Sequence, residues 1–174
     1  VELTVTDNDA LTGALELAYV IDTASLLIEH LWTAEGTIMA GSFDGEQTWL
    51  TQTPASGNAT CLAAIAPSWG QVWGTSTGHI YATFDRLATV EDLGTPHGAV
   101  ACTALWVHEE DNSRLWAGFN DGQVAYAVVD SVGFSATWSL RGDVGTCPIN
   151  EIRESVGSLN ELRATASTIY HYST

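Results

Sequence analysis

The best candidates for chemistry in this chain are a histidine and the three acidic residues that follow it. His108, Glu109, Glu110 and Asp111 bring one imidazole and three carboxyl groups together, and oxygen ligands of this kind suit hard cations such as Ca²⁺. The hydrophobic pattern places the acidic residues in a turn between strands, where carboxylates are ordinarily solvated. We therefore predict no metal site and no cofactor there, and treat the cluster as a candidate surface for a ligand or a partner.

Sequence motifs of the common enzyme classes are missing. The chain has no Gly-x-Ser-x-Gly nucleophile turn, no His-Glu-x-x-His zinc motif, no Cys-x-x-Cys pair and no glycine loop that could hold a phosphate. The sequence therefore predicts a protein that is not an enzyme.

Tryptophans form the second group of candidate residues. Trp32 and Trp69 fall in segments predicted to be the first turn of a repeat, where an exposed indole can stack on a sugar ring or contact a protein. They are our candidates for such a binding surface. Trp73 and Trp116, by contrast, recur with Met39 at one position of the repeat, which is typical of packing between repeats.

The three cysteines mark a repeating unit. Cys61, Cys102 and Cys147 each begin a similar apolar segment, and Ser25 begins a fourth. The four anchors are about 36 to 45 residues apart, a period that indicates propellers or solenoids. We expect the cysteines to be small buried core residues, on neighbouring units and too far apart for a disulfide.

Each unit reads as three or four short strands joined by tight turns. The approximate units are 25–60, 61–101, 102–146 and 147–174, preceded within residues 1–20 by one or two N-terminal strands, at residues 2–6 and 15–20. In the third unit we expect strands at residues 102–108, 115–119, 123–129 and 136–140, and in the fourth a strand at residues 161–165. Hairpin turns favour antiparallel blades over a parallel solenoid. We predict one all-β domain, a β-propeller with about four recognisable blades, which closes on itself through an N-terminal strand or is a piece of a larger propeller.

Residues 95–130 resemble a blade of the WD-repeat family. In that family a histidine precedes the innermost strand, an Asp-Gly turn follows the second strand, and an Asp ends the third. His97, Asp121-Gly122 and Val129-Asp130 match these roles. The signature Trp-Asp and Gly-His dipeptides are missing, so related propeller families match nearly as well. The resemblance implies a propeller fold and a role in protein interaction.

Two further motifs point to functions that we set aside. Residues 42–49, from Ser42 to Trp49, resemble the Asp-box of sialidase-type propellers with one glycine displaced. Our alignment of the repeats puts Asp44-Gly45 at the second hairpin turn, whereas the Asp-box belongs to a later turn, so we interpret the match as a coincidence. Arg141-Gly142-Asp143 is the tripeptide that integrins recognise, and we expect it in a loop.

Composition narrows the range of partners. The chain has 174 residues with 21 Asp and Glu against five basic residues, all Arg, and a net charge of −16. This charge disfavours binding to nucleic acid and anionic membranes, and no apolar run is long enough to span a bilayer. We predict a non-enzymatic interaction or assembly module that binds a protein. A carbohydrate-binding propeller and the propeller domain of a larger enzyme are the alternatives.

Overall fold

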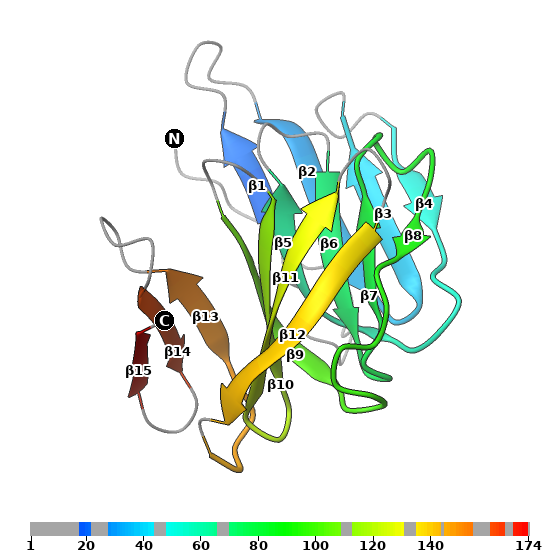
Figure 1. Ribbon diagram of the computed structural model, residues 1–174. Helices are drawn as coiled ribbons and strands as arrows, with labels where there is room; N and C mark the ends of the chain where they lie inside the picture. Colours follow the sequence, from blue (N-terminus) through cyan, green and yellow to red (C-terminus); the bar gives the residue numbers. More distant parts are fainter. Residues whose placement is uncertain are drawn as a thin grey trace, which may run out of the picture.

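The computed structural model describes residues 18–21, 28–43, 48–65, 70–108, 113–130, 135–143, 145–154, 161–165 and 169–173. Every regular element within these ranges is a β-strand, which confirms the predicted all-β class. The strands form four antiparallel sheets, and each sheet takes its strands in chain order (Figure 1).

The four sheets follow one another along the chain. The first holds β1 (Ala18–Ile21), β2 (Ile28–Glu35), β3 (Ile38–Ser42) and β4 (Leu50–Gln52). The second holds β5 (Ala59–Ile65), β6 (Gly70–Thr75), β7 (Ile80–Thr83) and β8 (Glu91–Asp92). The third holds β9 (Cys102–Val107), β10 (Arg114–Phe119), β11 (Gln123–Asp130) and β12 (Ser135–Asp143). The fourth holds β13 (Glu151–Glu154), β14 (Glu161–Thr165) and β15 (Ile169–Ser173).

The core lies between the sheets, and burial follows the position of a strand within its sheet. Every residue of β6 is buried, and so is every residue of β10 after its first. These strands have a partner strand on each edge and a packed cluster on each face. β12, the last strand of the third sheet, is mostly exposed. The central strands therefore carry the packing, and the outer strands carry the surface.

Neighbouring sheets meet at their first strands. β5 lies beside β9, β9 lies beside β13, and both β1 and β2 contact β5. Within the described ranges, no strand of the first sheet makes a comparable contact with a strand of the fourth. In this part of the chain the sheets therefore form a series in which each one packs on the next.

The first sheet differs from the predicted first unit. β1 pairs with β2 in antiparallel register, Ala18 opposite Trp32, so the first sheet begins before residue 25. Ala59 and Thr60 already belong to β5 of the second sheet. The strand expected at residues 15–20 was a candidate to close the propeller by completing the last sheet. That prediction is wrong, because β1 completes the first sheet instead. The strand expected at residues 2–6 lies outside the described residues.

Repeated hydrogen bonds at the sheet junctions define which positions are equivalent. The Thr60 hydroxyl donates to the carbonyls of Gly74 and Cys102, at 3.1 and 2.5 Å. The Thr103 hydroxyl donates to the carbonyls of Gly118 and Ile149, at 3.4 and 2.7 Å. Each threonine sits at a β-bulge in the first strand of its sheet. Thr60 and Thr103 are therefore equivalent residues of successive repeats.

This register corrects the alignment on cysteine. Cys61 lies opposite Gly74, and the residue opposite Gly118 is Ala104 rather than Cys102. Cys61 and Cys102 are thus two positions apart in the repeat. Both are buried, as predicted. Their Sγ atoms are only 3.7 Å apart, so the expectation that neighbouring cysteines lie far apart is wrong. Cys147 is only partly buried.

The same register separates the two recurrent tryptophans. Trp73 and Trp116 are buried and each belongs to an apolar cluster, so both pack in the core between sheets. Trp73, however, directly precedes Gly74, whereas Trp116 lies two residues before Gly118. A shift of one residue turns a side chain to the other face of a strand. Trp73 accordingly packs with Met39 toward the first sheet, and Trp116 packs with Ile149 toward the fourth.

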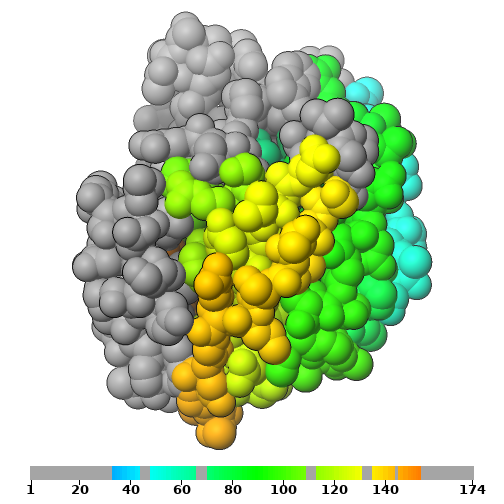
Figure 2. Space-filling model, in the orientation of Figure 1, coloured from blue at the N-terminus to red at the C-terminus, as the bar shows by residue number. Residues whose placement is uncertain are grey.

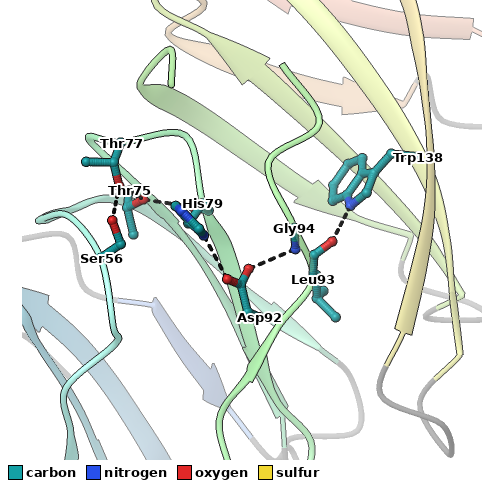
Figure 3. Close-up of polar contacts among 8 residues, drawn as sticks. All are labelled: Ser56, Thr75, Thr77, His79, Asp92, Leu93, Gly94 and Trp138. Carbon is teal, nitrogen blue, oxygen red and sulfur yellow. Dashed lines mark hydrogen bonds and ion pairs between the residues drawn. The ribbon is translucent and has the colours of Figure 1, made fainter. Parts of the chain in front are cut away.

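Polar contacts fix the short outer strand of the second sheet (Figure 3). The Trp138 indole N–H, on β12, donates to the Leu93 carbonyl at 2.7 Å and joins the third sheet to the second. His79 Nδ1 lies 2.7 Å from Asp92 Oδ2, and the His79 ring stacks on Tyr81. These contacts hold β8, which has only two residues, against the longer β7.

The connection between β7 and β8 is built around the carboxylate of Asp85. Asp85 accepts hydrogen bonds from the Thr89 backbone N–H at 2.9 Å, the Thr89 hydroxyl at 2.6 Å and the Thr83 hydroxyl at 3.0 Å. Arg86 and Leu87 have positive φ angles of 60° and 64°, which side chains rarely adopt. The carboxylate therefore organises a strained turn.

The residues Ser42, Asp44 and Thr48 have the same spacing as Thr83, Asp85 and Thr89. Ser42 ends β3 and Thr48 comes shortly before β4, so this motif lies in the third connection of its sheet, as Asp85 does. The earlier placement of Asp44-Gly45 at the second hairpin turn is wrong, because that turn is at Gly36. Residues 44–47 themselves lie outside the described residues. The alignment that argued against the Asp-box resemblance therefore no longer holds.

Replacing Asp85 by alanine is expected to destabilise the fold by about 1–3 kcal/mol, because three donors lose their acceptor.

Burial of the Asp85 carboxyl raises its pKa, but the hydrogen bonds from Thr89 and Thr83 together leave the pKa below its ordinary value. A lowered pKa in the folded state stabilises the fold above the unfolded pKa of about 3.9. The difference between wild type and Asp85→Asn should therefore shrink as the pH falls below that value, measured by urea unfolding at a series of pH values. A difference that is independent of pH would contradict this.

The Arg-Gly-Asp tripeptide is not in a loop. Arg141, Gly142 and Asp143 are the last residues of β12, and Gly142 and Asp143 pair with Val124 and Gln123 of β11. β12 crosses the visible face as a yellow to orange band (Figure 2). The guanidinium of Arg141 lies over the Tyr126 ring, 5.0 Å from its centroid. The expectation of a loop is wrong, and the strand pairing holds the tripeptide extended.

Candidate functional site

A cavity of about 600 Å³ lies where the first strands of three sheets come together. Residues 61–64 of β5, 103–107 of β9 and 150–153 at β13 line it. This volume falls in the range of small-molecule sites in proteins. The cavity brings residues from three sheets around one space, and we take it as the candidate site.

The cavity is lined by strand edges rather than by strand faces. A strand that presents a face to a space contributes alternate residues, whereas here each strand contributes consecutive residues. β5, β9 and β13 each stand at the end of the strand order of their sheet. Backbone N–H and C=O groups on that edge have no strand partner within the described ranges. The walls of the cavity therefore offer backbone hydrogen-bonding groups as well as side chains.

Three side chains give the cavity its chemical character. Trp106 on β9 is partly buried and contributes an indole. Arg153 and Glu151 on β13 form an ion pair with Nε and Oε1 2.5 Å apart, and their side chains are 72% and 49% exposed. A cavity whose lining residues include a tryptophan, an arginine and a glutamate can offer an aromatic ring, a guanidinium and a carboxylate to a polar ligand. The arrangement is suited to binding.

Of the six predicted site residues, the structure describes only Trp32 and His108. Trp32 lies within β2, opposite Gly41, so its predicted place in a turn is wrong, and its side chain is outside the described residues. Trp69, Glu109, Glu110 and Asp111 also lie outside the described residues.

His108 directly follows β9 and is buried, with 5% of its surface exposed. Its backbone N–H donates to the Arg114 carbonyl at 2.9 Å. Its ring packs edge-on against Trp106, with centroids 5.6 Å apart. His108 is therefore buried rather than on an exposed surface, and it is not among the residues that line the cavity.

Sequence reasoning missed Trp106, Glu151 and Arg153. Each of them lies a few residues after a cysteine anchor, in the first strand of its unit. Their place in the first strand of two successive units was the signal available. It was not recognised because first strands were interpreted as core, and the edge that they present to the cavity does not show in the hydrophobic pattern.

Metal binding and membrane insertion are two further possibilities for the described part of the chain. Within it, no three His, Cys, Asp or Glu side chains are grouped so that they could hold a metal ion. It also contains no helix of the length and apolar character needed to cross a membrane. Comparison of the sequence with protein-family models gave no match, and comparison with curated proteins gave none either.

Proposed function

We propose that this chain is a β-propeller module of non-enzymatic function that binds a protein partner in the cavity between β5, β9 and β13. The observation that carries the proposal is the cavity itself, about 600 Å³ in volume and lined by three strand edges and Trp106. The proposal has two parts, the propeller architecture and the use of the cavity.

The propeller architecture is supported by the repetition of contacts between sheets. Four antiparallel meanders follow one another, and the first strands of successive sheets are neighbours. His97 Nε2 lies 2.7 Å from Asp121 Oδ2, which joins the segment before β9 to the turn after β10. Ser56 and Thr77, at the equivalent places before β5 and after β6, are hydrogen-bonded at 3.0 Å. The first pair matches the histidine and turn-aspartate roles of the WD-repeat resemblance, and the second has two hydroxyl groups in the corresponding segments.

A protein partner is favoured by the chemistry of the cavity. Tryptophan and arginine are enriched among the residues that carry most of the binding energy in protein interfaces, and Trp106 and Arg153 face the same space. Strand edges supply the backbone groups that an extended segment of a partner uses. The net charge of −16 favours a basic segment over an acidic one and speeds its encounter with the protein.

A library of peptides about twelve residues long, basic, neutral and acidic, tests the proposal through binding measured by fluorescence anisotropy. We expect basic peptides to bind the wild type, and Trp106→Ala to weaken that binding by about tenfold or more. Trp49→Ala is the matched control, since Trp49 is 41% exposed and lies next to β4, away from the cavity. Arg153→Gln changes an exposed side chain and separates lost binding from lost folding. Equal binding by wild type and both cavity variants would refute the proposal.

A carbohydrate is the second candidate, favoured by the pairing of one indole with Arg153 and Glu151 on the same wall. Sugar rings stack on an indole and are oriented by charged hydrogen-bonding groups. A glycan array probed with the wild type and Trp106→Ala decides between the two. Binding of glycans that is lost in Trp106→Ala, together with no peptide binding, would assign the cavity to a carbohydrate.

A further inference from the structure

A pair of buried cysteine thiols lies at the wall of the cavity and belongs to two different sheets. Cys61 on β5 and Cys102 on β9 have their Sγ atoms 3.7 Å apart. Both are free thiols, and Cys61 lines the cavity while Cys102 is fully buried. We propose that Cys61 and Cys102 form a redox-active pair that a peroxide converts reversibly to a disulfide between the second and third sheets.

The β-bulges explain why the two thiols meet. Cys102 lies two positions before the residue of β9 that is equivalent to Cys61. In a regular strand, residues two positions apart point to the same face, so the two cysteines would ordinarily point the same way. The bulge at Thr103 shifts the register between Cys102 and Ala104, so Cys102 points back toward the second sheet. Cys61, on the other side of the bulge at Thr60, points forward toward the third sheet. The two side chains therefore converge between the first strands.

Gly74 leaves the space that the two sulfur atoms occupy. A Cβ atom at this position would lie 2.6 Å from the Cys102 Sγ and 2.7 Å from the Cys61 Sγ. No side chain therefore separates the thiols or fixes their distance. To form a disulfide, the sulfur atoms must move from 3.7 Å apart to the bonded separation of about 2.05 Å.

We place the first step at Cys61, because Cys61 is among the residues that line the cavity, whereas Cys102 is fully buried. The Cys61 thiolate attacks hydrogen peroxide, the O–O bond breaks, and Cys61 becomes a sulfenic acid with release of hydroxide. The Cys102 sulfur then attacks the Cys61 sulfur, the S–O bond breaks, and the leaving oxygen takes the Cys102 proton to depart as water. Overall, two thiols and one peroxide give one disulfide and two waters. Burial raises the pKa of the Cys102 thiol, so Cys102 is less readily deprotonated and is not the thiol that attacks the peroxide.

The disulfide would link β5 directly to β9. The chain from residue 61 to residue 102 contains the whole of the second sheet after its first strand, so this sheet would be closed into a covalent loop. Closing a loop of this length restricts the unfolded chain. The oxidised protein is therefore expected to unfold at a higher urea concentration than the reduced protein, and a thiol reductant should reverse the change.

Peroxide treatment of the folded chain, followed by thiol counting in denaturant and peptide mapping, tests the proposal. Starting from three thiols, we expect one to remain, a mass loss of about 2 Da, and a crosslinked peptide that joins Cys61 to Cys102. Cys147→Ser should still form the crosslink, whereas Cys61→Ser and Cys102→Ser should not.

The same oxidation in concentrated guanidinium chloride is the control, because the three cysteines then have no fixed distances and should form mixed pairs. Reduction by dithiothreitol should restore all three thiols. The proposal is overturned if the folded protein gains oxygen without a crosslink, if it dimerises through Cys147, or if the folded and unfolded proteins give the same mixture of pairs. The mapping uses the wild-type chain, so the result does not depend on the folding of any variant.

Discussion

Replacing Gly122 by alanine is expected to destabilise the fold by about 3 kcal/mol or more. Gly122 follows Asp121 in the turn between β10 and β11 and has a φ of +89°, a region that glycine adopts readily and other residues avoid. A Cβ atom there would also overlap the carbonyl oxygen of Gly145, in the segment that leads into the fourth sheet. Backbone strain and a collision with rigid backbone therefore add together.

Gly98→Ala is the matched control for Gly122→Ala. Gly98 also has a positive φ, +63°, but a Cβ atom there would have nothing within 4 Å. This variant should lose only the conformational part, about 1 kcal/mol. Gly78 repeats the arrangement of Gly122 one sheet earlier, because its Cβ would overlap the Gly98 carbonyl. Urea unfolding of the three variants measures the effect. Equal losses for Gly98→Ala and Gly122→Ala would show that the close approach contributes nothing.

The sequence was sufficient to predict the class of the fold and most of its strands. Alternating apolar residues and Asp-Gly or Thr-Gly turns predicted the third sheet within a few residues at each strand, and β14 (Glu161–Thr165) at its bounds. Local signals sufficed there because strand alternation and positive-φ turns are properties of neighbouring residues. The same signals cannot show which strand pairs with which, so β1 was assigned to the wrong sheet.

The equivalence of positions was predicted less well, for a physical reason. Cysteine and tryptophan were used as markers, yet Cys61 and Cys102 differ by two positions and Trp73 and Trp116 by one. Packing selects large or small apolar side chains on both faces of a central strand, so similar residues recur on opposite faces. The hydroxyl bonds of Thr60 and Thr103 mark the true register, but a threonine in a strand has no distinctive pattern in the sequence.

The candidate site escaped prediction because it depends on three sheets at once. Cys61, Trp106 and Arg153 are far apart in the sequence and meet only where β5, β9 and β13 converge. Sequence reasoning instead selected the exposed-looking residues of turns, among them His108, which is buried. The first strands carry apolar residues on both faces. In the sequence, a first strand whose edge lines a binding site therefore has the same apolar pattern as a strand buried in the core.

The placement of Trp73 and Trp116 on opposite faces leads to the second large effect. Trp73→Ala should destabilise the fold by about 3–5 kcal/mol, since the side chain is 0% exposed. Because Trp73 packs with Met39, the double variant with Met39→Ala should cost less than the sum of the single changes, by about 0.5–3 kcal/mol.

Trp116 should couple to a different partner. It packs with Ile149 against the fourth sheet, so Trp116→Ala and Ile149→Ala should be non-additive, while Trp116→Ala and Met39→Ala should add. Urea unfolding of the single and double variants measures both cycles, with Trp→Phe in place of Trp→Ala if a double variant fails to fold. If both tryptophans instead coupled to Met39, they would face the same way, and the register marked by Thr60 and Thr103 would be wrong. If Trp73 couples to Met39 and Trp116 couples to Ile149, the second and third sheets place their largest side chain on opposite faces of equivalent strands.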